Sequence, residues 1–231
     1  MKHIRPAIMI TIIFAIVTGF IYPGIVTAIG QVLFNHQANG SIVYANGQPV
    51  GSDLIGQYWT SSKYFHGRPS ATANPSTGNP SPYEADNSTA SNLGPTNGAL
   101  LNGNGKDVTL NPGDPVPAGA TPVAGQKNTY YVPGTYLGVD NYAAQFRKEN
   151  DLAPNTPLPS DIVTASGSGL DPDISPDAAY LQVNRVAQVR GLDANQVKQL
   201  VSNQVQGRFL GIFGDPYVNV LNLNLALDQL K

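Results

Sequence analysis

The stretch AIMITIIFAIVTGFIYPGIVTAIGQVLF at residues 7–34 contains no charged side chain. A helix of about 20 apolar residues, rising about 1.5 Å at each residue, crosses the hydrocarbon core of a bilayer, so this stretch is long enough to span it with some tilt. Pro23 has no N–H to donate and clashes with the preceding turn, so we expect a kink near Gly19. Gly19, Gly24 and Ala28 are small and favour close packing against a second membrane helix.

A cleaved signal peptide is a competing interpretation of this stretch, because residues 28–30 (AIG) resemble a cleavage site. The uncharged run is longer than the usual apolar region of roughly 7–15 residues, which favours a retained anchor. Lys2 and Arg5 precede the run. The positive-inside bias therefore places residues 1–6 in the cytoplasm and residues 35–231 outside, on a single-pass protein of the plasma membrane.

The composition excludes several classes of protein. The 231 residues include 13 Lys and Arg against 15 Asp and Glu, so the net charge is −2 and the basic excess that phosphate binding needs is missing. Nucleic acid is therefore not a predicted partner. No cysteine is present, which excludes disulfides, thiolate nucleophiles and cysteine-based zinc sites. Hydrophobic residues make up 41% of the chain, which is enough for a folded core.

Strand and loop signals dominate the first half of residues 35–231. Residues 71–135 are rich in Asn, Pro, Ser, Thr and Gly, which is typical of ordered loop. Alternating or β-branched segments beside turn residues favour short strands. Such strands are predicted at 41–44 (before an Asn46-Gly47 turn), at 53–59, and at 108–110 and 130–132, which could pair as a hairpin.

Helix signals dominate the second half. Ser175 is suited to cap a helix that ends at Gly191, with the apolar side chains on one face. A second helix is predicted from Asp193, with a capping box at its start, to Gly207. Further elements are predicted at 139–148 (helix), 217–223 (strand) and 224–230 (helix). These elements predict a small α+β extracytoplasmic domain with a two-helix hairpin packed on a sheet.

The sequence lacks the common motifs of catalysis. It contains no phosphate-binding loop, dinucleotide fingerprint, serine-hydrolase elbow or phosphorylated-aspartate motif, and its three histidines lack metal-ligand spacing. We therefore predict no cofactor, metal or catalytic residue. Residues 161–176 (DIVTASGSGLDPDISP) are open to three interpretations. Residues 166–169 could form an N–H nest for an anion, Asp171, Asp173 and Asp177 could attract a cation, or the segment is a tight connection.

A series of short blocks along the chain carries a family resemblance. The blocks are Tyr22-Pro23, GSDLIGQ (51–57), FHGRPS (65–70), SNLGPTN (91–97), VTASGSGLDPDISP (163–176), RVA (185–187), GIFGDP (211–216) and VNVLNLNLALD (218–228). In this order they resemble the KdpC family, a subunit of the bacterial and archaeal high-affinity potassium-transporting Kdp ATPase. The chain departs from the family at Asp173, where histidine is usual, and in a longer Gly/Pro-rich insertion at about 100–138.

The resemblance implies a non-catalytic accessory subunit of an ATP-driven potassium uptake complex. The implied partners are a potassium-translocating channel-like subunit, a P-type ATPase subunit, a small hydrophobic fourth subunit and membrane lipid. The complex uses ATP and potassium, whereas this chain is expected to assist assembly and to act as a catalytic chaperone that raises the ATP affinity of the pump subunit. Because the predicted domain lies outside the cell and ATP binds inside, such an effect has to pass through the membrane helices.

Partner contacts are predicted within the resembling blocks. They fall at Tyr22, Pro23, Phe65, Arg68, Ser166, Ser168 and Asp171. Two other classes compete with a pump subunit: an independently anchored extracytoplasmic binding or adhesion domain, and an anchored exterior hydrolase. The hydrolase needs a nucleophile with a base, and the sequence offers serines and carboxylates without a histidine partner.

Overall fold

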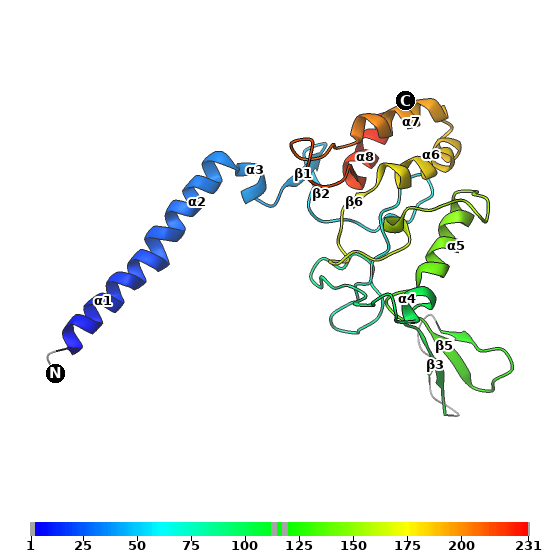
Figure 1. Ribbon diagram of the computed structural model, residues 1–231, viewed down its shortest axis with the longest axis horizontal. Coiled ribbons are helices and arrows are strands. Elements are labelled where there is room, and N and C mark those ends of the chain that lie inside the picture. The colour runs from blue at the N-terminus through cyan, green and yellow to red at the C-terminus, as the bar shows by residue number, and fades with distance from the viewer. Residues whose placement is uncertain (1–2, 112–114, 117–119, 231) are drawn as a thin grey trace. The chain divides into compact units, whose positions relative to one another are not determined.

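The chain divides into two compact units, residues 1–52 and 53–231, in the computed structural model shown in Figure 1. The structure describes residues 3–111, 115–116 and 120–230. The first unit holds a long apolar helix, a short helix and a β-hairpin, and the second holds the remaining helices and strands.

The apolar helix is continuous over Ile4–Leu33, and none of its residues is buried. It consists of α1 (Ile4–Ile16), a π-helical segment (Val17–Ile21) and α2 (Tyr22–Leu33). The π-helical segment includes Gly19, the residue whose carbonyl would pair with the N–H that Pro23 lacks. A wider turn accommodates the proline there, and the helix continues through it. By length and composition this helix is suited to cross a membrane.

A β-hairpin follows the short helix α3 (Asn35–Ala38). Strands β1 (Ile42–Ala45) and β2 (Gln48–Ser52) pair antiparallel around Asn46-Gly47. Both turn residues have positive φ, 51° and 75°, which is the type I′ geometry that Asn-Gly favours. The predicted strand at 53–59 is wrong, because the two-residue turn brings Gln48–Ser52 back as the partner strand.

The core of the second unit is helical (Figure 1). Helix α6 (Pro176–Arg190) packs antiparallel to α7 (Ala194–Gln204) as the predicted hairpin, and α8 (Val220–Leu227) packs against α7. The predicted apolar face of α6 is buried, together with residues from the other two helices. The buried side chains in this cluster include Ala179, Val183, Val186, Val197, Val201, Leu223 and Leu227.

The caps of the helical hairpin follow the predicted signals. The Oγ of Ser175 accepts a hydrogen bond from the N–H of Ala178 at 3.2 Å, and Gly191 ends α6 in the left-handed region with φ 66°. The carboxylate of Asp193 accepts from the N–H groups at the start of α7. Helix α7 ends at Gln204, before the predicted Gly207.

The sheet beneath the hairpin is much smaller than predicted. Among the described residues it is a ribbon of β6 (Asp173–Ile174) and β7 (Val218–Asn219). The predicted strand at 217–223 is wrong after Asn219, whose side chain accepts from the N–H of Asn222 and caps α8. The buried positions that follow, Val220, Leu223, Asn224 and Leu227, have helical spacing, so helix α8 starts earlier than the predicted 224.

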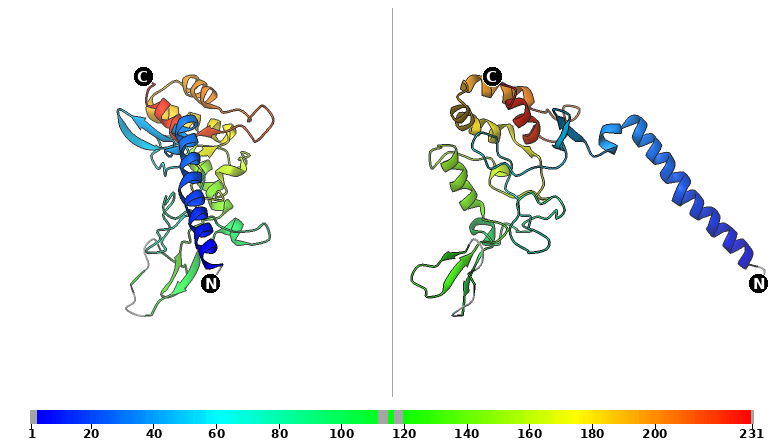
Figure 2. Two further views of the ribbon diagram at one scale, coloured as in Figure 1. Left: turned by 90° about the vertical axis from the view of Figure 1, so that its left-hand side faces the viewer. Right: turned by 180° about the vertical axis from the view of Figure 1, so that it is seen from behind.

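The Gly/Pro-rich residues at about 100–138 contain a separate small sheet. Strands β3 (Lys106–Thr109), β5 (Thr129–Val132) and β4 (Thr121–Pro122) lie in the order β3-β5-β4, which confirms the predicted pairing of 108–110 with 130–132. Helix α4 (Ala99–Asn102) precedes the sheet and α5 (Val139–Glu149) follows it. Figures 1 and 2 show the sheet at the opposite end of the second unit from α7 and α8.

Three buried polar side chains hold residues 62–66 against the helices. Asn224 exchanges two hydrogen bonds with the backbone of Phe65, accepting at 2.8 Å and donating at 3.0 Å. Gln182 does the same with His66 at 2.8 and 3.1 Å. Arg185 donates to the carbonyls of Ser62 and Tyr64. These side chains replace the missing sheet partner of the segment, which leads directly into the candidate site.

Candidate functional site

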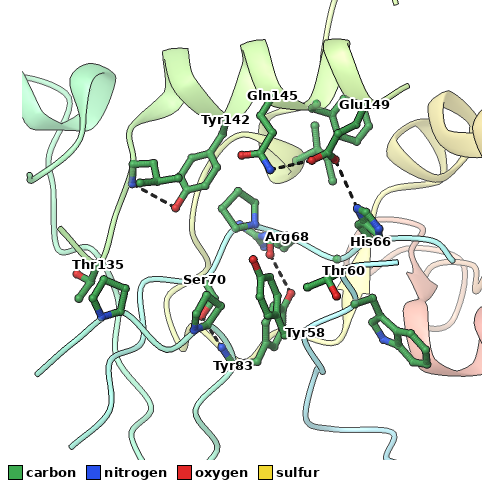
Figure 3. A pocket seen from close by; sticks show the side chains of 18 of the residues that line it. Tyr58, Thr60, His66, Arg68, Ser70, Tyr83, Thr135, Tyr142, Gln145 and Glu149 are labelled. Atoms are coloured by element: carbon green, nitrogen blue, oxygen red, sulfur yellow. Dashed lines mark hydrogen bonds and ion pairs between the residues drawn. The ribbon is translucent and has the colours of Figure 1, made fainter. Parts of the chain in front are cut away.

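The second unit contains a cavity of about 290 Å³ (Figure 3). Helix α5 forms one side of it, and the loop segments 58–70, 80–83 and 133–137 form the others. Aromatic rings and prolines make up much of the lining, with a few polar side chains between them. The lining includes Tyr58, Tyr83, Tyr142, Pro69, Pro82, Pro133, His66, Arg68, Gln145 and Glu149.

The polar groups on the α5 side are already paired. The Oε2 of Glu149 lies 3.5 Å from Nδ1 of His66, and its Oε1 accepts from Gln145 at 2.7 Å. The hydrogen bond with His66 lowers the pKa of Glu149, and that with Gln145 acts in the same direction against the effect of burial. Glu149 is therefore a carboxylate at neutral pH that ties α5 to the 58–70 segment.

Tyr83 supports the floor of the cavity. Its hydroxyl donates to the carbonyl of Arg68 at 2.9 Å, and its ring stacks on Tyr58 with 6.4 Å between centroids. Burial raises the pKa of Tyr83 well above its ordinary value, so the hydroxyl stays protonated. A side chain on Gly67 would place its Cβ 2.6 Å from the Tyr83 hydroxyl, which explains the glycine in the FHGRPS block.

An ion pair joins the cavity wall to the Ser/Gly-rich segment. Nη1 of Arg68 lies 2.7 Å from Oδ2 of Asp171, and both side chains are partly exposed. The other carboxylate oxygen of Asp171 accepts from the N–H of Asp173 at 3.1 Å. Within the described chain, Nε of Arg68 is buried and has no hydrogen-bond partner. The guanidinium is therefore held mainly by its contact with Asp171.

The Ser/Gly-rich segment uses its own side chains to satisfy its backbone. The Oγ of Ser166 accepts from the N–H of Gly169 at 2.9 Å, and the Oγ of Ser168 accepts from Leu170 at 3.1 Å. The carbonyl of Gly169 accepts from the Oγ of Ser70 at 2.7 Å. Because the N–H of Gly169 in the suggested anion nest, and that of Leu170 directly after it, are occupied in this way, the geometry favours the tight-connection interpretation.

Asp173 lies in a partly buried acidic environment. Burial raises the pKa of Asp173 to about 6, the charges of Asp171 and Asp53 act in the same direction, and a hydrogen bond from Asn219 opposes them. That bond runs from Nδ2 of Asn219 to Oδ1 of Asp173 over 3.1 Å. Across the described ranges, no group of three or more histidine or carboxylate side chains has the geometry of a metal site.

Five of the seven predicted contact residues are exposed or partly exposed. Arg68, Ser168 and Asp171 are partly exposed, and the ion pair brings the first and last of these together. Tyr22 and Pro23 are exposed on the apolar helix of the first unit.

Two of the predicted contact residues are buried in the chain itself. The side chain of Phe65 is 0% exposed in the helical core, and Ser166 is 5% exposed with its hydroxyl bonded within its own loop. Their contact with a partner stays a prediction, and in this fold both side chains contribute to packing within the second unit.

Sequence reasoning missed Tyr83, His66 and Glu149. Tyr83 follows Pro80-Ser81-Pro82 as a lone large aromatic residue in a polar stretch, which is the signal of a loop anchor. His66 and Glu149 are far apart in sequence and meet only through the fold. The arrangement can bind a ligand among its rings, but its described ionisable groups are engaged in pairing rather than arranged as a nucleophile and base.

Comparisons with known proteins agree with one another. The family described as "KdpC: K+-transporting ATPase, c chain" matches residues 4–123 and 120–229. A "Potassium-transporting ATPase KdpC subunit" of Rhodopseudomonas palustris (strain BisB18) is 43% identical over 100% of both chains. Proteins with the same description from Methylobacterium nodulans and Paraburkholderia phytofirmans are 42% and 43% identical, over 100% of this chain and 98% and 99% of theirs.

Proposed function

The chain belongs to the KdpC family of K⁺-transporting ATPase subunits, and from this premise we propose that it raises the ATP affinity of the pump subunit indirectly, through membrane helices. Membership makes it a membrane-associated accessory subunit of a potassium uptake complex with protein partners. The proposal adds that it assists assembly and acts as a catalytic chaperone without catalysis of its own. Its partners are then a channel-like potassium-translocating subunit, a P-type ATPase subunit and a small hydrophobic subunit.

One observation carries this proposal: among the residues that the structure describes, Ile4–Leu33 is the one helix suited to cross a membrane, and the large second unit follows it in the chain. Lys2 and Arg5 precede the uncharged part of this helix and favour the cytoplasm for its N-terminal side. The large unit then lies on the outer side, where it is separated from cytoplasmic ATP by the bilayer. A ligand can shift a distant affinity only by binding one conformational state better than another, so the helix is the physical route for the effect.

The outer placement also gives the second unit a position near the ion entrance of the channel-like subunit. Residues 6–231 carry 11 basic and 15 acidic side chains, a net charge of −4 that weakly favours cations. The cavity and its Arg68–Asp171 wall belong to this unit, and the exposed part of that wall is the proposed partner contact.

The test of this function is the ATP dependence of potassium-stimulated ATPase activity in the reconstituted complex. We expect omission of this chain to raise the KM for ATP by about fivefold or more, the size of a typical coupling between sites. Re-addition of the purified chain should restore the KM. An unchanged KM, with the complex assembled, would contradict the chaperone role.

Topology is tested separately by cysteine labelling, because the native chain contains no cysteine. Ser76→Cys and Ser202→Cys place a thiol at exposed positions of the second unit, and His3→Cys places one before the apolar helix. An impermeant maleimide should label the first two on intact cells and the third only after permeabilisation. The reverse pattern would place the second unit in the cytoplasm and reopen direct contact with nucleotide.

A further inference from the structure

The second unit exposes an apolar loop tip between α7 and β7. We call residues 209–213 (FLGIF) the apolar tip. Its four large side chains are strongly exposed: Phe209 72%, Leu210 74%, Ile212 72% and Phe213 61%. In Figure 1 the loop that carries the tip projects beyond helices α7 and α8. A soluble surface rarely gathers so many large apolar side chains unless it contacts another apolar phase.

The backbone of the tip satisfies much of its own hydrogen bonding. Gln206 and Tyr217 exchange two hydrogen bonds at its base, at 2.8 and 3.1 Å. Phe209 and Phe213 exchange two more at 2.9 and 3.0 Å, and the N–H groups of Gly211 and Ile212 donate within the loop. A segment with internally paired N–H groups can enter a nonpolar environment at much lower cost than open loop.

Charge is confined to the base of the loop. No charged residue lies between positions 209 and 214. Arg208 and Asp215 flank this interval and pair with each other at 3.1 Å, in contact with solvent. Arg208 therefore lies next to the tip, where its guanidinium can bind phosphate oxygens.

The tip lies at the end of the second unit where the chain arrives from the apolar helix. Asp53 is the first residue of the unit, and its carbonyl accepts from Nδ2 of Asn219 at 3.0 Å. Its carboxylate accepts from Asn222 at 2.8 Å. Asn219 follows the base of the apolar loop by two residues. The two residues after Asp53, Leu54 and Ile55, are also exposed, at 62% and 40%, and add apolar surface at this end.

The chain between the helix and Asp53 is too short to let this end move far from a membrane. Ile42 and Ser52 are direct partners in the hairpin, so the hairpin adds little length between them. Only residues 34–41 then separate the end of the apolar helix from the hairpin base. Fully extended at about 3.5 Å per residue they reach about 30 Å, and the helical turn of Asn35–Ala38 shortens this.

We propose that the apolar tip enters the lipid interface and forms a second membrane contact of this chain. Lipid suits the tip because its apolar surface carries no charge to specify a protein partner and four of its N–H groups, those of Phe209, Gly211, Ile212 and Phe213, are paired. Insertion of the tip would bring Arg208 to the depth of the lipid headgroups. The contact limits rotation of the second unit about its tether. This lipid contact requires only that Ile4–Leu33 crosses the membrane. It is therefore possible in either orientation of the helix, and a negative result for it would leave the proposed function untouched.

The test uses the full chain reconstituted in vesicles of zwitterionic and anionic phospholipid, with or without bromine on the upper acyl chains. The variant Phe213→Trp adds a reporter to the single native Trp59, which is partly buried and packs against the core. Brominated lipid should remove most of the added fluorescence. Ile212→Trp provides a second reporter in case the first variant does not fold, as judged by the thermal unfolding transition.

Leu101→Trp is the matched control, because Leu101 is 51% exposed on α4, which lies beside the small sheet away from α7 and α8 (Figure 1). The fluorescence that this control tryptophan adds should be the same in vesicles with and without bromine. Equal fluorescence of the Phe213→Trp chain with and without bromine would overturn the proposal. If that tryptophan is protected from aqueous iodide but is not quenched by bromine, the tip contacts a protein surface. This result would also overturn the proposal.

Discussion

Arg68 and Asp171 form an ion pair with 2.7 Å between Nη1 and Oδ2, although 103 residues separate them in the sequence. Both belong to blocks that carry the family resemblance, FHGRPS and the Ser/Gly-rich segment. The pair therefore fixes the cavity wall to the connection that leads into α6. Its partial exposure makes it both a structural link and the accessible part of the predicted interface.

Removal of either partner should destabilise the second unit. We expect Arg68→Ala and Asp171→Ala each to lower the free energy of unfolding by about 1–2 kcal/mol, because a charged hydrogen bond is lost in a partly screened site. Thermal and urea unfolding in detergent measure this. In the double variant the losses should be less than additive. Strict additivity would show that the two side chains do not interact in solution.

Gly169 is expected to tolerate no side chain. It has φ 68°, and a Cβ would approach both Thr72 Cγ2 and Thr89 O to 2.5 Å. Gly169→Ala should therefore lower the free energy of unfolding by more than about 2 kcal/mol, from backbone strain and overpacking together.

Two other glycines separate these effects. Gly191 has a similar φ of 66° but open space around its Cβ position, so Gly191→Ala reports the backbone cost alone. Gly167 has open space and no positive φ, so Gly167→Ala should be close to neutral. A loss at Gly169 no larger than that at Gly191 would mean that the loop relaxes away from Thr72.

Asn224 is expected to be among the most sensitive positions of α8. Replacement by alanine leaves the N–H and carbonyl of Phe65 buried and unpaired. We expect a loss of about 2–4 kcal/mol for the two groups. Asn203→Ala on the exposed face of α7 is the control and should cost less than about 0.5 kcal/mol. Similar losses for both variants would argue against the described role of Asn224.

The helical hairpin was predictable because its signals are local. Ser175, Gly191 and Asp193 act on their own neighbours, and the apolar spacing of α6 points to one face. The strand predicted at 217–223 failed because VNVLNL alternates as a strand does, while the cap at Asn219 and burial on one helical face decide the structure.

The site was less predictable because long-range pairs build it. Phe65 lies in a block with Arg68, but the fold buries the first and leaves the second partly exposed. The pairing of His66 with Glu149 depends on where α5 packs, which no local pattern specifies. A family resemblance identifies such blocks without distinguishing the residues that support the fold from those that face a partner.

The stability of the second unit should depend on the ionisation of Asp173. Its pKa is about 6 in the folded chain, with burial as the first cause, and about 3.9 when unfolded. The folded state therefore binds more protons between about pH 4 and pH 6, so this group's stabilisation is present below pH 4 and lost as the pH rises through 6.

Asp173→Asn should remove this pH dependence and keep an oxygen acceptor for Asn219. Relative to the native chain, the variant should gain about 1–3 kcal/mol at pH 7 and little at pH 4. The difference between the two unfolding curves, measured from pH 4 to 8, isolates this carboxyl from other titrating groups. A constant difference across that range would contradict a raised pKa at Asp173.

Gly24 should matter for assembly and not for the fold of the isolated chain. A Cβ at Gly24 or at Gly19 meets nothing within 4 Å, so the chain itself leaves this face of the apolar helix open. Small residues allow membrane helices to approach closely, and we expect a partner helix to pack here. Gly24→Leu should keep the thermal unfolding transition of the second unit while lowering the amount of the proposed partner subunits recovered with the tagged chain in mild detergent. Ile25→Leu preserves side-chain size at the neighbouring position and should recover both subunits normally. Full recovery with Gly24→Leu would place the partner helix on another face.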